Sequence, residues 1–328
     1  MAFTRRAFVK TGLVLLPATR LRMLATSLRP NSRFHNVQIG IIVSPYNYAS
    51  IPVGADQFLH TLLQLGLSAV EVQDVRCEVY AGAPSAPREG YSGSPSERGH
   101  PMTADERLAA ERKQAEELTR WRLGNTAAIL EKYTTLSKLY RDAGVKIYAL
   151  RLANAKLEIT DPEYNYFFEA AKALGANQIT TELPDDPALS QRLGDLAGKH
   201  KIMMGYHNHS QVNEHSWDTA LQQSRWNGIQ LDIGHFAAAI NGSPIPFMRE
   251  HFARITSIHL KDRQYRIHGG RNMPWGQGET PVKDVLLLME KERYRFPAGI
   301  ELEYRIPAGS TPEKEIENCL DFCRQALA

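Results

Sequence analysis

Residues 202–209 read IMMGYHNH, residues 228–235 read GIQLDIGH, residues 255–262 read ITSIHLKD and residues 299–304 read GIELEY. Each stretch opens with a short apolar run and closes with polar side chains. Short apolar runs of this kind are typical of strands that are buried in a parallel sheet. The four stretches therefore indicate four successive strands whose polar ends lie together at one edge of a sheet.

The same pattern continues toward the N-terminus. Four more apolar runs precede these strands, at residues 37–43, 69–73, 145–152 and 178–183. Amphipathic stretches with helical spacing lie between and after the runs, at residues 55–65, 162–174, 187–200, 218–225, 246–252, 282–292 and 312–328. Eight strands that alternate with helices predict an α/β fold, the (β/α)8 TIM barrel. An open doubly wound sheet is the alternative, but the first run continues as VSPYN and lacks the GxGxxG pattern of dinucleotide-binding proteins.

The distribution of charge argues against one class of partner. The chain has 328 residues, with 39 Lys and Arg and 36 Asp and Glu. Residues 1–33 hold seven of the basic residues and no acidic residue, so the remaining chain has 32 basic and 36 acidic residues and a net charge of −4. Binding to nucleic acid through phosphate contacts requires a broad basic surface. We therefore expect no nucleic-acid partner.

Residues 1–33 have the order of an export leader. Residues 4–10 read TRRAFVK, and an apolar stretch follows at residues 13–18. This order resembles a twin-arginine export signal and predicts a periplasmic protein, with a disordered basic tail as the alternative. No later stretch has the roughly 18 consecutive apolar residues that a membrane span requires, so we expect no membrane span. Residues 34–328 are then expected to form one catalytic domain.

One connection between predicted strands is unusually long. More than 70 residues separate the second run from the third, and we interpret about residues 80–130 as an insertion. Its Gly-, Pro- and Ser-rich part, residues 82–101, is predicted as a loop, and Thr103 and Glu106 have the spacing of a capping box that opens a long helix. Long loops in compact domains are usually lids or binding loops. We expect the insertion to cover the active face, with disorder as the alternative.

The polar residues at the ends of the last runs alternate with apolar ones. Because every second residue of a strand lies on one face, three pairs are each expected to point into the barrel: His207 with His209, His259 with Lys261, and Glu301 with Glu303. Buried imidazoles and carboxylates are costly unless they bond to one another or share a cation. Two imidazoles and two carboxylates suit Mn, Zn, Fe or Co better than Ca or Mg. We therefore expect one divalent metal ion.

The motifs YHNH, LDIGH, HLKD and LEY, with Gly276-Gln277-Gly278 before the last unit, resemble those of the sugar phosphate isomerase/epimerase family, the xylose isomerase-like TIM barrels. The resemblance covers about residues 36–328. In that family, one residue at the end of each of strands five to eight holds a divalent metal. The resemblance implies that the metal ligands here are His207, Asp232, His259 and Glu303.

Position 207 departs from the family pattern. Many members have Glu where this chain has His207, and the epimerases use two metal-bound carboxylates on opposite faces of the sugar. A His at this position is found in relatives that resemble inosose dehydratase and in members that process keto-sugars. Both an epimerase and an elimination reaction therefore stay open. Glu182, at the end of the fourth run, could join the metal shell or bind substrate, or it could be a solvated acid.

The resemblance also suggests roles in catalysis. A metal that binds two adjacent sugar oxygens would acidify the neighbouring C–H bond and stabilise the enediolate. Glu303 is the first candidate for the base, and His209 is the second. Lys261 could hydrogen-bond the substrate oxyanion, or it could pair with Asp262 or Glu301. Three residues are expected to bind substrate, each with a packing or ion-pair alternative: His235, Arg151 and Trp275.

These features predict a metal-dependent isomerase or epimerase that acts on a sugar, keto-sugar or cyclitol by proton abstraction next to a carbonyl. A dehydratase or keto-glycoside lyase with the same site is the alternative, and a non-catalytic exported sugar-binding protein is a minor one. A relative of the DNA-repair enzyme endonuclease IV is disfavoured, because that family needs more metal ligands and a basic surface. Whether the chain forms a homo-oligomer stays open.

Overall fold

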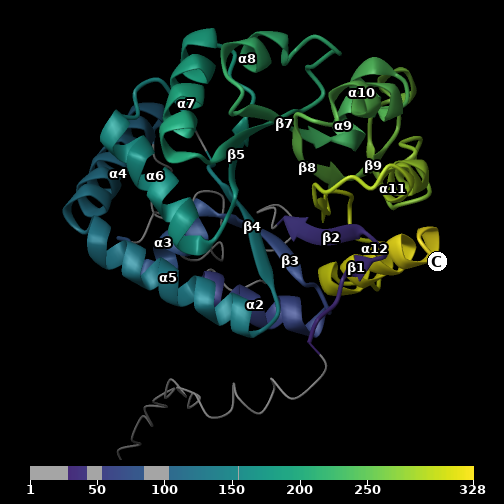
Figure 1. The fold of residues 1–328 in the computed structure, drawn as a ribbon, viewed down its shortest axis with the longest axis horizontal. Helices are drawn as coiled ribbons and strands as arrows, with labels where there is room; N and C mark the ends of the chain where they lie inside the picture. The colour runs from purple at the N-terminus through teal and green to yellow at the C-terminus, as the bar shows by residue number, and fades with distance from the viewer. Residues whose placement is uncertain (1–28, 43–53, 85–102, 154) are drawn as a thin grey trace, which may run out of the picture.

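A closed ring of parallel strands forms the centre of the molecule (Figure 1). The computed structural model describes residues 29–42, 54–84, 103–153 and 155–328. β2 pairs with both β3 and β11, which closes the sheet into a barrel and confirms the predicted (β/α)8 fold. Within the described residues the barrel has eight strands: β2 (Val37–Ile42), β3 (Ala69–Gln73), β4 (Lys146–Arg151), β5 (Gln178–Glu182), β6 (Met203–His207), β7 (Asn227–Asp232), β8 (Ile255–Leu260) and β11 (Ala298–Ile300).

Three short strands lie outside the ring. β1 (Arg33–Phe34) pairs antiparallel with β2. β9 (Asp262–Arg263) and β10 (Asn272–Met273) form a small hairpin after β8, with the 3-10 turn η2 (Arg266–His268) between them. The hairpin places the residues that follow β8 over the carboxyl end of the barrel.

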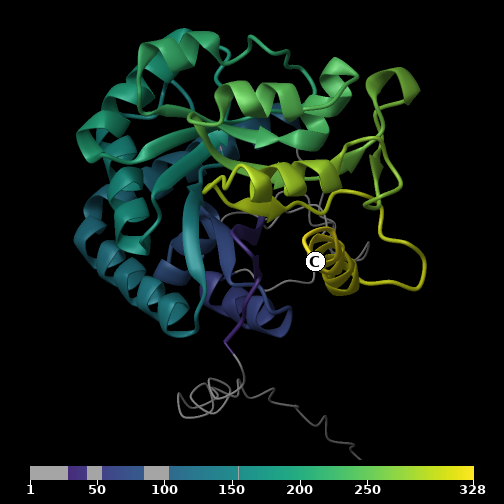
Figure 2. The ribbon, with the colours of Figure 1, turned by 45° about the vertical axis from the view of Figure 1, so that its right-hand side comes forward.

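Helices form the outer layer around the strands, as Figures 1 and 2 show. The seven helices predicted from apolar spacing are all present, each within two residues of its predicted ends. They are α2 (Ala55–Gln64), α6 (Asp161–Leu174), α7 (Pro187–His200), α8 (Asp218–Gln223), α10 (Ile245–His251), α11 (Val282–Lys291) and α12 (Pro312–Ala326).

Two further helices start directly at the ends of strands. α3 (Asp74–Ala81) follows β3 without a linker, and α9 (Ile233–Ile240) follows β7 in the same way. Neither helix was predicted from the sequence, because no turn residue separates the strand from the helix at either place. Asp232, the last residue of β7, caps α9 by accepting a hydrogen bond from the His235 backbone N–H (2.7 Å). This cap fixes one carboxylate oxygen at the edge of the barrel.

The insertion after β3 contains two helices, α4 (Ala104–Gly124) and α5 (Thr126–Asp142). The predicted capping box is present, since the Glu106 backbone N–H donates to Thr103 Oγ1 (3.2 Å) and the Thr103 N–H donates to Glu106 Oε2 (2.8 Å). The predicted long helix is therefore α4, and after Asn125 the chain continues as α5, which packs in the helical layer. Residues 85–101 of the predicted covering loop, 82–101, lie outside the described residues.

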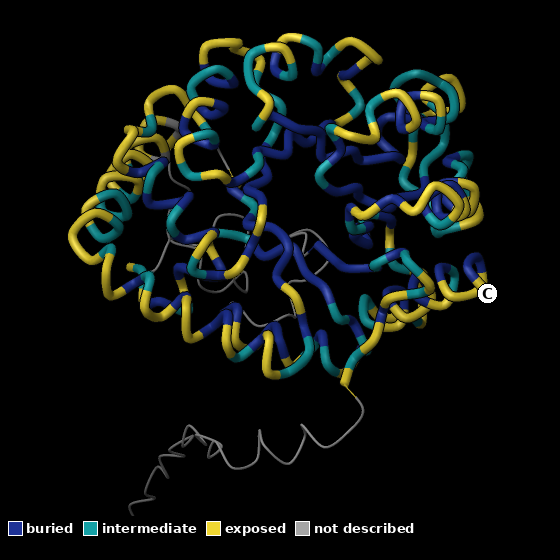
Figure 3. The backbone as a smooth tube through the Cα atoms, viewed as in Figure 1, coloured by how far each residue is buried: buried dark blue, intermediate teal, exposed yellow. Residues whose placement is uncertain are grey.

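Alternation along the strands separates an apolar outer layer from a polar interior. Val70 and Val72 of β3 belong to the main hydrophobic core beneath the helices, whereas Glu71 between them is fully buried. Ile258 and Leu260 flank His259 of β8 in the same way. Figure 3 shows the strands buried and the outer sides of the helices exposed. Because buried charged groups need partners, the interior of the barrel is where the site is built.

The described residues contain no helix that is both long enough and apolar enough to cross a membrane. The predicted export leader falls almost entirely on residues 1–28, outside the described residues, so it stays a prediction.

Candidate metal centre

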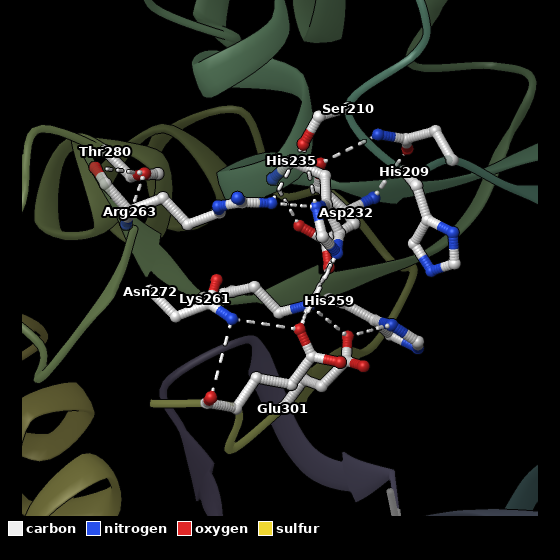
Figure 4. A network of polar contacts seen from close by, with 12 residues as sticks. His209, Ser210, Asp232, His235, His259, Lys261, Arg263, Asn272, Thr280 and Glu301 are labelled. Carbon is white, nitrogen blue, oxygen red and sulfur yellow. Dashed lines mark hydrogen bonds and ion pairs between the residues drawn. The ribbon is translucent and has the colours of Figure 1, made fainter. Parts of the chain in front are cut away.

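Four candidate ligands meet at the carboxyl ends of neighbouring strands. Figure 4 shows Asp232, His259 and Glu301 turned toward one another, with the Lys261 side chain between them. The group is buried, and its ligand atoms all lie within 4.8 Å of one another. It consists of His207 at the end of β6, Asp232 at the end of β7, His259 in β8 and Glu301 directly after β11. Three of these four are the ligands that the family resemblance implied.

The fourth position is occupied by Glu301, where the resemblance implied Glu303. β11 ends at Ile300, so strand alternation no longer keeps the two glutamates on one face beyond that residue. The Glu301 backbone N–H still donates to Leu260 O (3.1 Å), which holds Glu301 beside β8. The Glu303 carboxylate is instead 18% exposed and accepts a hydrogen bond from Lys261 Nζ (2.6 Å). The geometry thus places Glu301 among the ligands and Glu303 at the edge of the site.

One buried atom of the group, His207 Nδ1, has no partner in the part of the chain that the structure describes, and Asp232 Oδ2 makes no hydrogen bond but lies 2.9 Å from the ammonium of Lys261. Burial holds the pKa of His207 well below its usual value, so its imidazole is neutral and offers a lone pair. Burial also raises the pKa of Asp232 to about 7, although the charge of Lys261 opposes this shift. Unpaired buried polar atoms are costly. A divalent cation would satisfy His207 Nδ1 and would be bound by the nearby Asp232 carboxylate as well, so the donor set fits a metal.

His259 lies between two carboxylates. Its Nδ1 is 2.8 Å from Glu301 Oε2, and its Nε2 is 2.9 Å from Glu71 Oε2. Burial would lower the pKa of His259, but the charges of Glu301 and Glu71 outweigh it and raise the pKa to about 10. His259 therefore carries a proton that a metal ion must displace.

Lys261 supplies a fixed positive charge within the group. Its Nζ lies 2.9 Å from Asp232 Oδ2 and 3.2 Å from Glu301 Oε2, in addition to its bond with Glu303. Burial opposes the charged form, but these carboxylates outweigh it and raise the pKa of Lys261. Lys261 and the protonated His259 together do not balance the four carboxylates around them, which belong to Glu71, Asp232, Glu301 and Glu303. The excess negative charge is a further reason why the group suits a divalent cation.

Asp262, the last residue of the HLKD motif, fixes a turn of the chain beside the site. The Asp262 carboxylate accepts hydrogen bonds from the backbone N–H groups of Gly276 (2.8 Å), Gly278 (2.9 Å) and Thr280 (3.2 Å). A Cβ on Gly278 would overlap that carboxylate, so the turn requires glycine there. Asp262 thus holds the Gly276-Gln277-Gly278 turn and does not pair with Lys261, which the sequence had left open.

His209 and Glu182 lie at the mouth of the barrel. Their side chains are 53% and 41% exposed, and His209 Nδ1 is 3.7 Å from Glu182 Oε2. Together with His207 they form a second group whose ligand atoms lie within 4.8 Å of one another. Arg151 forms an ion pair with Glu182 and donates to Gln230 Oε1 (3.0 Å). Arg151 is therefore in the ion-pair arrangement that the sequence left as an alternative to substrate binding.

The other two predicted substrate-binding residues lie in different surroundings. His235 accepts a hydrogen bond from Lys261 Nζ at its Nε2 (2.9 Å) and has its Nδ1 3.1 Å from Ser210 Oγ, so it borders the metal group. Burial lowers the pKa of His235, which keeps its ring neutral. Trp275 instead packs edge-on against Phe322 of α12, with ring centroids 5.8 Å apart. Trp275 is therefore in the packing arrangement that the sequence left as an alternative to substrate binding.

Sequence reasoning missed two residues that shape the group. Asn208 holds the end of β7, because its Oδ1 accepts from the Asp232 backbone N–H (2.9 Å) and its Nδ2 donates to Asp232 O (3.2 Å). Glu71 is the second, since its Oε2 lies 2.9 Å from His259 Nε2. The available signal was a charged residue in the middle of the apolar run AVEVQ, flanked by valines that face the helices.

The barrel fold and the group of candidate ligands can be compared with known protein families. The model of the protein family described as "Xylose isomerase-like TIM barrel" matches residues 131–326, which is more than half of the chain. The chain therefore belongs to that family. A comparison with curated protein sequences finds no match.

Solved structures show the same fold at low sequence identity. A xylose isomerase domain protein from Planctomyces limnophilus is 16% identical, with a TM-score of 0.57 over 88% of this chain and 96% of that one. The 3-keto-D-glucoside 4-epimerase of E. coli is 9% identical, with a TM-score of 0.54 over 88% and 99%. A probable 3-DHS dehydratase of Bacillus anthracis is 11% identical, with a TM-score of 0.53 over 88% and 97%. The fold therefore carries both epimerases and a dehydratase.

The two glutamates can be separated by matched substitutions. Glu301→Gln is expected to weaken metal binding by more than about 100-fold, the upper range for residues that only support a ligand. Glu303→Gln should keep its metal and lower kcat by about 100-fold or more, as loss of a general base does. Metal content and kcat of both variants test this assignment. Loss of metal in Glu303→Gln with retention in Glu301→Gln would reverse it.

Proposed function

We propose that this protein is a divalent-metal-dependent isomerase or epimerase that removes a proton next to the carbonyl of a sugar, keto-sugar or cyclitol. The observation that carries the proposal is the buried group of His207, Asp232, His259 and Glu301 at the carboxyl end of the barrel, in which His207 Nδ1 has no partner among the described residues. Active residues of TIM-barrel enzymes lie at this end. The metal identity stays open among Mn, Zn, Fe and Co.

The metal, when bound, would polarise the substrate carbonyl and stabilise negative charge on its oxygen. The side chains around the site supply the remaining chemistry. Lys261 Nζ can donate a hydrogen bond to the same oxygen, since the ammonium already lies among the ligand carboxylates. His235 accepts from Lys261 and keeps that ammonium in place.

Two side chains are candidates for moving the proton. Glu303 accepts hydrogen bonds from Lys261 Nζ (2.6 Å) and Asn272 Nδ2 (3.4 Å), which orient its carboxylate beside the site. His209 follows β6, which is separated from β11 by the two strands β8 and β7, and it is half exposed at the mouth. One group could therefore remove a proton and the other could return one, which isomerisation and epimerisation both require.

Elimination of water or an alcohol is the second candidate reaction, as in a dehydratase or keto-glycoside lyase. The observation that favours it is the pair His207 and His209 at the end of β6. His207 contributes an imidazole to the ligand group, and His209 is an imidazole that could protonate a leaving oxygen. Relatives of this fold include a 3-keto-D-glucoside epimerase and a probable dehydratase, so both outcomes are compatible with the barrel.

A product assay separates these reactions. The metal-loaded protein is incubated in D₂O with keto-sugars, cyclitols and keto-glycosides, and the products are followed by mass spectrometry and NMR. We expect products of unchanged composition that carry deuterium at the carbon next to the carbonyl. Loss of water or of an alcohol would establish the elimination instead. Retention of a sugar without turnover would favour the non-catalytic binding protein, and the Asp232→Asn variant is the control for background exchange.

We also propose that residues 34–328 form one catalytic domain and that residues 1–33 direct export to the periplasm. Fractionation of cells that express the full chain, compared with an Arg5→Lys, Arg6→Lys double variant, tests the export proposal.

A further inference from the structure

The starting observation is a carboxylate placed deep inside the barrel, below the metal group. Glu71 lies in the middle of β3 and is fully buried. Burying an unpaired carboxylate is very costly, so its partners define what it does. They come from three other strands, β5, β7 and β8.

The carboxylate of Glu71 is held in one position. Its Oε1 accepts a hydrogen bond from Thr180 Oγ1 (2.5 Å), and its Oε2 accepts one from Gln230 Nε2 (2.7 Å). Arg151 Nη1 donates to Gln230 Oε1 (3.0 Å), so the amide of Gln230 has to present its NH₂ group to Glu71. Thr180 and Gln230 are themselves fully buried. The orientation of Glu71 is therefore set by neighbours that do not belong to the metal group.

The remaining contact of Glu71 is with His259. Glu71 Oε2 lies 2.9 Å from Nε2, and both side chains are fully buried. Because a carboxylate only accepts hydrogen bonds, Nε2 must carry the hydrogen. The other ring nitrogen, Nδ1, then faces the ligand group, where it lies 2.8 Å from Glu301 Oε2. Nδ1 also faces a carboxylate, so without a cation both ring nitrogens carry a hydrogen. Glu71 is the partner that would keep the Nε2 hydrogen when a cation displaces the one on Nδ1.

We propose that Glu71 is a positioning residue of the metal centre, which holds His259 by its Nε2–H so that Nδ1 is the metal-binding nitrogen. The inference deepens the proposed function and rests on it. A carboxylate behind a ligand histidine fixes the tautomer and increases the basicity of the ligand nitrogen. A purely structural role for Glu71 would make the same internal bonds but would leave metal affinity unchanged.

The test combines substitution with a measurement on the unaltered protein. Cobalt dissociation constants are determined by chelator competition for wild type, Glu71→Gln, Glu71→Leu and Glu78→Gln. Glu78 is a matched control, because it is a buried carboxylate that pairs with Arg122 of α4 (2.7 Å). We expect Glu71→Leu to bind cobalt about 10- to 100-fold more weakly than wild type. Glu71→Gln should lose less, because its amide oxygen can still accept from Nε2, and Glu78→Gln should bind like wild type.

The second measurement needs no variant at position 71. Zinc-loaded protein labelled with ¹⁵N-histidine is examined by NMR, and the His259 signals are assigned by their loss in His259→Gln. We expect a protonated Nε2 and a metal-bound Nδ1. Zinc bound through Nε2, or equal cobalt affinity in Glu71→Leu and wild type, would overturn the positioning role while leaving the metal centre intact. Failure of the wild type to bind either metal would overturn the centre itself and this inference with it.

Discussion

The Asp232→Asn variant is expected to lose its bound metal and about 1,000-fold or more of its turnover. A metal ion contributes several kcal/mol of charge stabilisation in the transition state, and each 1.36 kcal/mol corresponds to a factor of ten in rate. Asparagine keeps an oxygen that can cap α9 at the His235 backbone N–H, so the local fold should persist. Its NH₂ group, however, cannot replace Oδ2 as a ligand.

Metal content by elemental analysis and kcat under saturating metal measure this effect. Asp161→Asn is the matched control, because Asp161 is an exposed acid that pairs with Arg192 at 2.7 Å. The control should keep both metal and turnover. Full activity of Asp232→Asn, or activity of wild type after complete metal removal, would contradict the proposed centre.

Metal affinity is expected to rise steeply with pH, by about tenfold per unit for each proton displaced. The pKa of His259 is raised to about 10 and that of Asp232 to about 7. Both groups must lose a proton before they can bind a cation, so the two contributions have the same sign. Between pH 7 and 9 we expect His259 to dominate, with about one proton released per metal bound.

Calorimetry in two buffers of different ionisation enthalpy measures the proton release.

The thermal stability of the metal-free protein provides a control, because it is expected to fall as the pH rises. A raised pKa in the folded state means that protonated His259 stabilises the fold fully below its unfolded value of about 6.5 and that this contribution is lost as the pH rises to about 10. Metal-free protein should therefore melt at lower temperature toward pH 10, while its metal affinity increases. A metal affinity that is independent of pH between 7 and 9 would disprove the role of His259.

The fold was predictable because its signals are local. Each barrel strand lies within a short, mostly apolar run of the sequence, and helix ends such as that at Gly175 are marked by residues suited to a left-handed backbone. α9 was not predicted, because LDIGH carries no turn signal between Asp232 and Ile233. Its first turn is recognisable only once the Asp232 cap is seen in space.

The site was predictable where a strand fixes the side chain and not where the strand ends. His207, Asp232 and His259 all lie in strands, so their direction follows from alternation. Glu301 and Glu303 follow Ile300, where β11 has already ended, and their positions depend on the contacts with Leu260 and Lys261. The role of Glu71 depends on a contact between residues 188 positions apart, which no local pattern encodes.

Lys261 has a consequence for how the protein matures. Its ammonium neutralises part of the acidic mouth from within the chain, so the barrel does not need an external ion to bring Asp232, Glu301 and Glu303 together. Folding and loading can then be separate events, in that order. Under the proposed metal dependence, cellular metal supply would then set the active fraction of the folded protein.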